Sequence, residues 1–247
     1  MKEIKIKILG NGGCLNKGLP YNSFIINNDF LFESPPDLML SLNKNKIDIS
    51  KINNLFISHL HGDHIFGFPF LIINLWILIN NQQDYSLNIY GPPKISQTLS
   101  HLVEMAFSTN HPCYSWMNNS VRFIEIDNNM KLNYSDLECY FFELEHIKFT
   151  YGLKIKNKSD NIFTYFADTK WGSSVENELK EIPKYVLADM NGGNPDLHMS
   201  KDDFTIKGSD ITKGKTIFYG THLSDEFDDI ENIKCTKAGE EIIVQYY

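Results

Sequence analysis

Three histidines and one aspartate stand within six residues, in the segment Ser58-His59-Leu60-His61-Gly62-Asp63-His64. Where the backbone is extended, the alternate residues His59, His61 and Asp63 point to one side. The glycine allows a turn that brings in His64 as well. Neutral imidazole and carboxylate groups suit zinc and related first-row ions. We therefore interpret the segment as a metal-binding turn, with solvated loop histidines as the alternative.

Strands that end in polar residues are the elements expected to position this turn and its partners. The turn itself follows the run 52–57, which has the composition of a strand. Three further candidate ligands follow other predicted strands, namely His146, Asp168 and His222. A polar residue at the end of a strand commonly lies at the edge of a sheet, where sites form. Each residue alone is equally well explained as a cap or a surface group, but together with the turn they indicate one site.

Strand and helix patterns alternate along the whole chain. Strands are predicted over 4–9, 23–26, 30–32, 52–57, 87–90, 121–126, 137–144, 150–155, 162–166, 185–188, 216–219 and 241–247. Helices are predicted over 38–42, 65–79, 94–107, 174–181 and 202–206. No linker, charge block or low-complexity tract divides the chain. We therefore expect a single domain, 1–247, of the α/β class with layered helices and sheets.

One stretch, 108–120, has no clear period. It is a candidate lid or substrate loop, and irregular packing is an equally good interpretation.

The composition excludes some classes of function. The chain has 247 residues and a formal net charge of −8, and its pI is near 5.5. A protein that grips a long nucleic acid usually has a basic surface, which this composition does not provide. A small anionic substrate held by metal ions remains compatible, because bound cations reverse the local sign of the field.

The sequence also predicts a soluble cytoplasmic protein that is not in a membrane. Its four cysteines are scattered and are expected to be reduced thiols. The first nine residues alternate apolar and charged side chains, which is typical of a strand and not of a signal peptide. The apolar run 65–79 is interrupted by Gly67, Pro69 and Asn74 and is shorter than the ~20 residues that a span needs. We interpret it as a buried helix beneath the metal-binding turn, with a subunit contact as the alternative.

The motif His59-x-His61-x-Asp63-His64, with the later candidate ligands in the same order, resembles the metallo-β-lactamase superfamily. The opening segment Leu9-Gly10-Asn11-Gly12-Gly13 and the hairpin after it resemble the first strands of that superfamily. The resemblance implies an αββα sandwich of two mixed sheets flanked by helices, with two divalent metal ions between the sheets. It implies that one ion is held by His59, His61 and His146, the other by Asp63, His64 and His222, and that Asp168 bridges them.

The ligand set lacks a cysteine and resembles the ribonuclease Z and phosphodiesterase branch of the superfamily. In Asp196-Leu197-His198-Met199-Ser200, the branch's His-x-Ser element implies that His198 is a catalytic acid or phosphate contact. The alternative is a helix flank with Ser200 as the cap. Asp63 is the second candidate catalytic residue. Glu33 stands where the branch usually has an aspartate, so its role is open.

The tRNA-gripping arm of ribonuclease Z has no room in this chain. Only 21 residues separate His146 from Asp168, and they are expected to form two strands with a turn at 157–160. Together with the acidic pI, this argues against a tRNA substrate. The sequence therefore favours metal-assisted hydrolysis of a small phosphodiester, cyclic nucleotides included.

Several details stay open at this level. Zinc is the favoured metal, with manganese as the alternative. Hydrolysis of another ester (a lactone or a thioester) and metal-dependent nucleotide binding without turnover are the alternative functions. Glu33 or Glu145 is a candidate for orienting the imidazoles. Aromatic residues are candidates for stacking on a base or, more simply, for the core or an interface: Tyr114, Trp116, Tyr151 and Trp171. A homodimer is expected by analogy with related phosphodiesterases.

Overall fold

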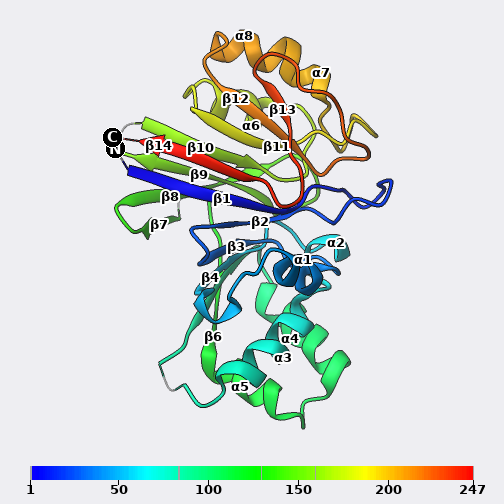
Figure 1. The fold of residues 1–247 in the computed structure, drawn as a ribbon, viewed down its shortest axis with the longest axis vertical. Coiled ribbons are helices and arrows are strands. Elements are labelled where there is room, and N and C mark those ends of the chain that lie inside the picture. The colour runs from blue at the N-terminus through cyan, green and yellow to red at the C-terminus, as the bar shows by residue number, and fades with distance from the viewer. Residues whose placement is uncertain (1, 83, 129, 159, 247) are drawn as a thin grey trace.

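The computed structural model describes residues 2–82, 84–128, 130–158 and 160–246. Within these ranges, two seven-stranded sheets pack face to face, and helices cover the outer side of each sheet (Figure 1). The predicted fold class, an αββα sandwich of two mixed sheets, is confirmed. The predicted domain 1–247, turn 157–160 and strand 241–247 include Met1, Ser159 and Tyr247, which lie outside the described residues.

The first sheet has the strand order β14-β1-β2-β3-β4-β5-β6. Its members are β1 (Lys2–Gly10), β2 (Ser23–Ile26), β3 (Phe30–Phe32), β4 (Asn54–Phe56), β5 (Leu87–Gly91), β6 (Val121–Glu125) and β14 (Glu241–Tyr246). Strands β3 to β6 run parallel, whereas β14, β1, β2 and β3 pair antiparallel. The parallel half delivers the carboxyl ends of its strands to one edge, and the metal-binding turn follows β4 there.

The second sheet has the order β13-β12-β11-β10-β9-β8-β7. Its members are β7 (Lys131–Tyr134), β8 (Leu137–Leu144), β9 (Thr150–Asn157), β10 (Asp160–Phe166), β11 (Tyr185–Asp189), β12 (Ile217–Thr221) and β13 (Ile233–Cys235). Strands β10 to β13 run parallel. The sequence patterns missed β7 and β13, which are the two edge strands. Both are short, with four and three residues.

The helices form two outer layers (Figure 1). The first sheet is covered by α1 (Leu38–Lys44), α3 (Phe68–Ile79), α4 (Ile95–Phe107) and α5 (Pro112–Ser120). The second sheet is covered by α6 (Ser173–Leu179) and by a continuous run of α7 (Lys201–Asp203), the π-helical segment η2 (Phe204–Gly208) and α8 (Ser209–Thr212). Two short elements, η1 (Ile49–Lys51) and α2 (Gly62–Ile65), flank β4.

Aromatic side chains fill the space between the sheets below the site. Phe24 and Phe32 stack with ring centroids 4.2 Å apart, and Tyr165 of the second sheet meets Phe32 edge-on at 5.9 Å. Phe56 of β4 packs on Phe141 of β8 at 5.6 Å. Aromatic pairs of this kind add roughly 0.5–1.5 kcal/mol each beyond the burial of their area. The strand ends that carry the site are therefore fixed relative to each other.

The predicted helix over 65–79 is broken into two, α2 and α3. The break lies at Gly67, where a Cβ atom would stand 2.0 Å from the carbonyl oxygen of Pro35. The Gly67 amide donates to the Ser34 carbonyl at 2.8 Å, so this close approach fixes the chain behind the metal-binding turn. The prediction of a buried helix holds for only one side of α3, because Phe70 and Ile77 are exposed.

The segment Gly62–Ile79 is long and apolar enough to cross a membrane, with a mean hydropathy of 1.6, and half of it is buried inside the protein. A half-buried core helix passes the same test, so this is weak support for a span.

The interpretation of 108–120 as a lid or an irregular loop is wrong. Residues Pro112–Ser120 form α5, which begins with Pro112 in its first turn and is capped by the His111 side chain. Cys113, Trp116 and Met117 are buried against the outer face of the first sheet. Only these three positions carry the helical period, which is too few for the pattern to stand out from the sequence.

Candidate metal centre

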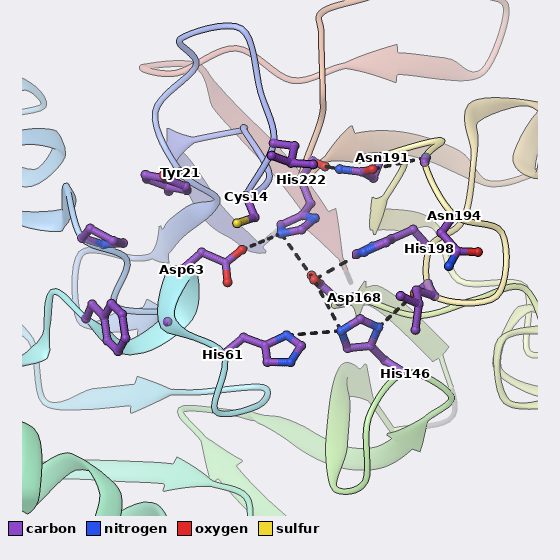
Figure 2. A pocket seen from close by; sticks show the side chains of 16 residues that line it. Cys14, Tyr21, His61, Asp63, His146, Asp168, Asn191, Asn194, His198 and His222 are labelled. Carbon is purple, nitrogen blue, oxygen red and sulfur yellow. Dashed lines mark hydrogen bonds and ion pairs between the residues drawn. The ribbon is translucent and has the colours of Figure 1, made fainter.

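Side chains from four strand ends converge at one edge of the sandwich. In Figure 2, His61 and Asp63 come from the turn after β4, and they face His146, Asp168 and His222 from the loops after β8, β10 and β12. Parallel strands bring their carboxyl ends to the same edge, which is why residues so far apart in sequence meet here. The structure brings together all seven residues that the sequence predicted as metal ligands.

The first donor cluster consists of three imidazoles. His59 Nε2 lies 3.0 Å from His61 Nδ1, and His146 Nε2 lies 3.4 Å from the same nitrogen. All three donor atoms lie within 4.8 Å of one another. Three nitrogens directed at one point in this way can hold a divalent ion.

The second donor cluster contains Asp63, His64 and His222, whose donor atoms again lie within 4.8 Å of one another. His222 Nε2 lies 3.3 Å from Asp63 Oδ2, and His64 Nε2 lies 3.7 Å from it. This cluster has a carboxylate where the first has a third imidazole, so it would give its ion a harder donor set.

Asp168 lies between the two clusters and reaches both. Its Oδ2 is 3.4 Å from His222 Nε2 and 4.0 Å from His59 Nε2, while its Oδ1 is 3.4 Å from His64 Nε2. The Asp168 carboxylate is almost fully buried. Neither its Oδ1 nor His64 Nε2 makes a hydrogen bond with any described residue. Buried polar atoms without such partners fit a site built for cations.

The outer nitrogens of three imidazoles face other protein groups. His59 Nδ1 lies 3.0 Å from Ser58 Oγ, and His146 Nδ1 lies 3.0 Å from the Leu197 carbonyl oxygen. His64 Nδ1 lies 3.3 Å from Glu33 Oε2. The hydrogen bonds of His59 and His146 hold their rings with Nε2 turned inward, as metal-binding histidines are normally held, and the Glu33 carboxylate lies beside the outer nitrogen of His64.

The charges of the cluster also fit divalent ions. Burial, followed by the nearby His64, lowers the pKa of His59 well below its ordinary value, which keeps that imidazole neutral. Burial would raise the pKa of Asp168, but His222 and His64 hold it well below its usual range. Burial lowers the pKa of His64, but the charges of Asp168 and Glu33 raise it well above its ordinary value. A bound cation would take the place of that proton.

Glu33 is the buried partner of the metal-binding turn. It is fully buried, accepts a hydrogen bond from the Ser58 amide at 3.2 Å and another from the Tyr165 hydroxyl at 3.2 Å. Glu33, whose role the sequence left open, thus faces His64. Glu145, the other candidate, has no hydrogen bond or ion pair with an imidazole among the described residues: it accepts from Ser173 and Ser174 at the start of α6, so Glu33 and not Glu145 takes this role.

His198 lies at the side of the clusters and is held by Asp189. Its Nδ1 is 2.8 Å from Asp189 Oδ2, and a carboxylate only accepts, so Nδ1 carries the proton. Burial lowers the pKa of His198, but the hydrogen bond and charge of Asp189 raise it above its ordinary value. Ser200 does cap α7, in a reciprocal capping box with Asp203. The cap is thus observed, and the role of His198 as a catalytic acid or phosphate contact stays a prediction.

Sequence reasoning missed Asp189 and Asn191. Asp189 ends β11, so the rule that found Asp168 and His222 was sufficient to find it as well. Asn191 donates from its Nδ2 to the His222 carbonyl oxygen at 3.1 Å, and its amide donates to Asp189 Oδ1 at 2.9 Å. His222 has a φ of 55°, an uncommon backbone conformation for a non-glycine residue. Asn191 helps to hold it there.

A cavity of about 690 Å³ opens over the two clusters. Beside the donors, its lining includes the apolar or aromatic residues Leu15, Tyr21, Pro36 and Phe66 and the polar residues Asn191, Asn194 and His198. The aromatic residues proposed from the sequence for base stacking are not among its described lining residues: Tyr114, Trp116, Tyr151 and Trp171. Trp116 and Tyr151 are buried in the core, and Trp171 packs on Phe204, as the simpler alternative expected.

The two packed sheets and the paired His/Asp clusters are those of a metallo-β-lactamase fold protein, as the resemblance implied. The family model described as Anti-Pycsar protein Apyc1 matches residues 4–239, and the chain belongs to that family.

Individual relatives agree with this assignment. The chain is 31% identical over 162 residues to a ribonuclease Z of Picrophilus torridus, covering 62% of this chain and 48% of that protein. It therefore spans about half the length of that curated relative. Among solved structures, the metallo-β-lactamase fold protein YhfI from Bacillus subtilis superposes with a TM-score of 0.75 at 14% identity, covering 98% of this chain and all of that one. Human tRNase Z, short form, gives a TM-score of 0.74 at 16% identity over 98% of this chain and 100% of that one. At such identities, the two structures support the fold alone.

Proposed function

We propose that this protein is a binuclear metal-dependent hydrolase that acts on small phosphodiesters. The observation that carries the proposal is the convergence of two donor clusters on Asp168, with the His198–Asp189 pair directly beside them. The family and its ribonuclease Z relatives support metal-dependent hydrolysis.

The two donor clusters are the proposed metal ligands. One ion would be held by His59, His61 and His146, the other by Asp63, His64 and His222, with Asp168 shared. Zinc is the proposed metal and manganese the alternative, because imidazole and carboxylate donors suit both. When bound, a pair of divalent ions activates water and offsets the charge that develops on phosphate oxygens.

Asp63 and His198 are the proposed catalytic residues. The Asp63 side chain is 12% exposed, compared with 3% for Asp168, so Asp63 is the site carboxylate that faces the cavity more openly. It is placed to orient the attacking water and to accept its proton. His198 uses Nδ1 for Asp189, which leaves Nε2 as the atom that donates a proton to the departing oxygen.

A small substrate, such as a cyclic nucleotide, fits the surroundings of the site. The segment between His146 and Asp168 folds as the β9–β10 hairpin, with its described residues in the second sheet and not in an extended arm. The cavity volume suits a mononucleotide-sized ligand. The net charge of −8 disfavours a long polyanion.

The proposal is tested by assaying metal-loaded protein against 3′,5′-cyclic mononucleotides, cyclic dinucleotides, a lactone and a thioester. Cyclic nucleotide hydrolysis that disappears in Asp63→Ala supports it. Hydrolysis of only the lactone or thioester would replace it with another ester chemistry. Tight nucleotide binding without turnover would support a binding protein.

A homodimer is also proposed, through the outer face of α3. Phe70, Ile77 and Leu78 are exposed there, and the helix contains no charged residue. Light scattering of the wild type and of Ile77→Lys tests this: a dimer that dissociates in the variant is expected. A wild-type monomer would exclude it. The cytoplasmic location stays a prediction.

A further inference from the structure

A buried tyrosine hydroxyl group lies between the two sheets, behind the second donor cluster. Tyr165 of β10 is fully buried, and its ring meets Phe24 edge-on at 5.0 Å and Phe32 at 5.9 Å. A hydroxyl group at the tip of such a ring needs polar partners, because a buried hydroxyl without one is costly. Tyr165 has two, both on the side of the first sheet: Glu33, which follows β3, and Asn22, which precedes β2.

The charges set the direction of each hydrogen bond around this hydroxyl group. The Glu33 carboxylate only accepts, so the Tyr165 hydroxyl donates to its Oε1, at 3.2 Å. Burial, followed by the charges of Glu33 and Asp168, raises the pKa of Tyr165 well above its ordinary value, so the proton stays on the hydroxyl. The hydroxyl oxygen accepts from Asn22 Nδ2 at 3.0 Å, and Asn22 Oδ1 accepts from the Thr221 hydroxyl at 2.6 Å. We call these four side chains the tyrosine network: Glu33, Tyr165, Asn22 and Thr221.

Each end of the tyrosine network reaches a ligand of the second donor cluster. At one end, Glu33 Oε2 lies 3.3 Å from His64 Nδ1. At the other end, Thr221 directly precedes His222, whose φ of 55° is uncommon for a residue other than glycine. The members of the network are at most 3% exposed, so water has little access to these hydrogen bonds. The network therefore joins the supports of two ligands that come from different sheets.

The first donor cluster has separate supports. The outer nitrogens of His59 and His146 face groups that are not members of the tyrosine network. Glu33 also accepts from the Ser58 amide, but that hydrogen bond uses Oε2, whereas Tyr165 donates to Oε1. Loss of the Tyr165 hydroxyl should therefore disturb the second cluster more than the first.

We propose that Tyr165 is a positioning residue whose hydroxyl group aligns the second donor cluster for its ion. Through one end of the tyrosine network it supports His64, and through the other it supports the backbone at His222. This inference rests on the proposed function, since it concerns the proposed ligands of the second ion. Loss of a group that orients a metal ligand from behind typically weakens metal binding about 10- to 100-fold, and a group one contact further away should have an effect near the lower end.

Tyr165→Phe tests the proposal, because it removes the hydroxyl group and keeps the packed ring. Calorimetric titration of metal-free protein with zinc gives the dissociation constants of the two ions. One of them should rise about tenfold, and the other should change less than about threefold. An anomalous difference map from crystals at limiting zinc should show the weakened peak at the second cluster. Unchanged constants, or an equal weakening of both peaks, would overturn the proposal.

Tyr134→Phe is the matched control. Tyr134 is also buried, and its hydroxyl also donates to a carboxylate, that of Asp29. Among the described residues, Asp29 makes no hydrogen bond with a proposed ligand. Both variants should lower the Tm of the metal-free protein, but only Tyr165→Phe should change a zinc constant. An equal rise in Tyr134→Phe would show that the effect comes from lost stability, and would overturn the proposal.

Thr221→Val tests the other end of the tyrosine network, because valine keeps the shape of threonine without its hydroxyl group. The same zinc constant should rise about threefold. In the double variant with Tyr165→Phe, the two losses should be less than additive, as expected for members of one hydrogen-bond network. Additive losses would show two independent supports and would contradict the network.

The zinc measurements also separate this proposal from the proposed function. If Tyr165→Phe weakens only the ion in the second cluster, the proposal stands even where no phosphodiester is hydrolysed. If phosphodiesters are hydrolysed and the variant binds both ions as the wild type does, the proposal fails alone. A wild type that binds fewer than two ions would overturn both.

Discussion

His64 shows how single residues set the geometry of the centre. It is fully buried between two carboxylates, with Glu33 on Nδ1 and Asp168 facing Nε2. Glu33 has a φ of 64°, so the chain adopts an uncommon conformation to place this side chain. Contacts behind a metal ligand orient the ligand and raise its basicity.

Replacing Glu33→Gln should weaken metal binding about 10- to 100-fold, because the amide loses the charge that supports His64. Competition with a chromogenic chelator measures this. Glu145→Gln is the control, since Glu145 contacts Ser173 and Ser174 instead of a ligand. Equal losses in both variants would contradict the role given to Glu33.

His198→Gln should lower kcat by about 10²- to 10⁴-fold for a substrate with an alkoxide leaving group, because proton donation to that oxygen is lost. The loss should be much smaller for bis(p-nitrophenyl) phosphate, whose phenolate leaves without a proton. Metal content should stay at the wild-type level. Equal losses on both substrates would indicate that His198 positions the phosphate instead of donating a proton.

Asp189→Asn should reproduce most of the leaving-group effect of His198→Gln, because Asp189 Oδ2 is the partner of His198 Nδ1. It should also weaken metal binding slightly, since Asp189 Oδ1 lies 3.8 Å from His222 Nδ1. Steady-state kinetics on the two substrates and a metal titration measure both effects. Wild-type kinetics in Asp189→Asn would show that Asp189 does not support the role of His198.

At the scale of elements, the strand ends were predictable and many of their partners were not. His146, Asp168 and His222 could be placed from the sequence because a β-rich run ends just before each. The contact between Glu33 and His64 depends on how β3 and β4 pair, and a single sequence does not reveal that pairing.

The finding that residues Pro112–Ser120 form the packed helix α5, and not a lid or an irregular loop, can be tested by mutation. Trp116 is 8% exposed and stacks on Tyr85 with ring centroids 6.0 Å apart. Trp116→Ala should reduce the free energy of unfolding by about 3–5 kcal/mol, as removal of a buried aromatic side chain does. Denaturant unfolding measures this loss. The kcat of the folded protein should not change, and a fall in kcat at full metal content would restore the lid interpretation.

At the scale of the whole molecule, both sheets contribute ligands to one centre, so metal binding and stability should be linked. The first sheet supplies His59, Asp63 and His64 after β4, and the second supplies Asp168 and His222 after β10 and β12. A ligand that binds only the folded state at 100 times its Kd stabilises that state by about 2.7 kcal/mol. Chelator treatment should therefore lower the Tm, and added zinc or manganese should restore it. A Tm that does not respond to either would show that the centre does not hold metal across the two sheets.

The most direct test of the central claim is an anomalous difference map from crystals grown with zinc. The account predicts two peaks, one among His59, His61 and His146 and the other among Asp63, His64 and His222, with Asp168 between them. Loss of both peaks in Asp168→Ala would agree with a shared ligand. A wild-type map with no peak at these residues, or with a single one, would contradict the binuclear centre on which the proposed hydrolysis depends.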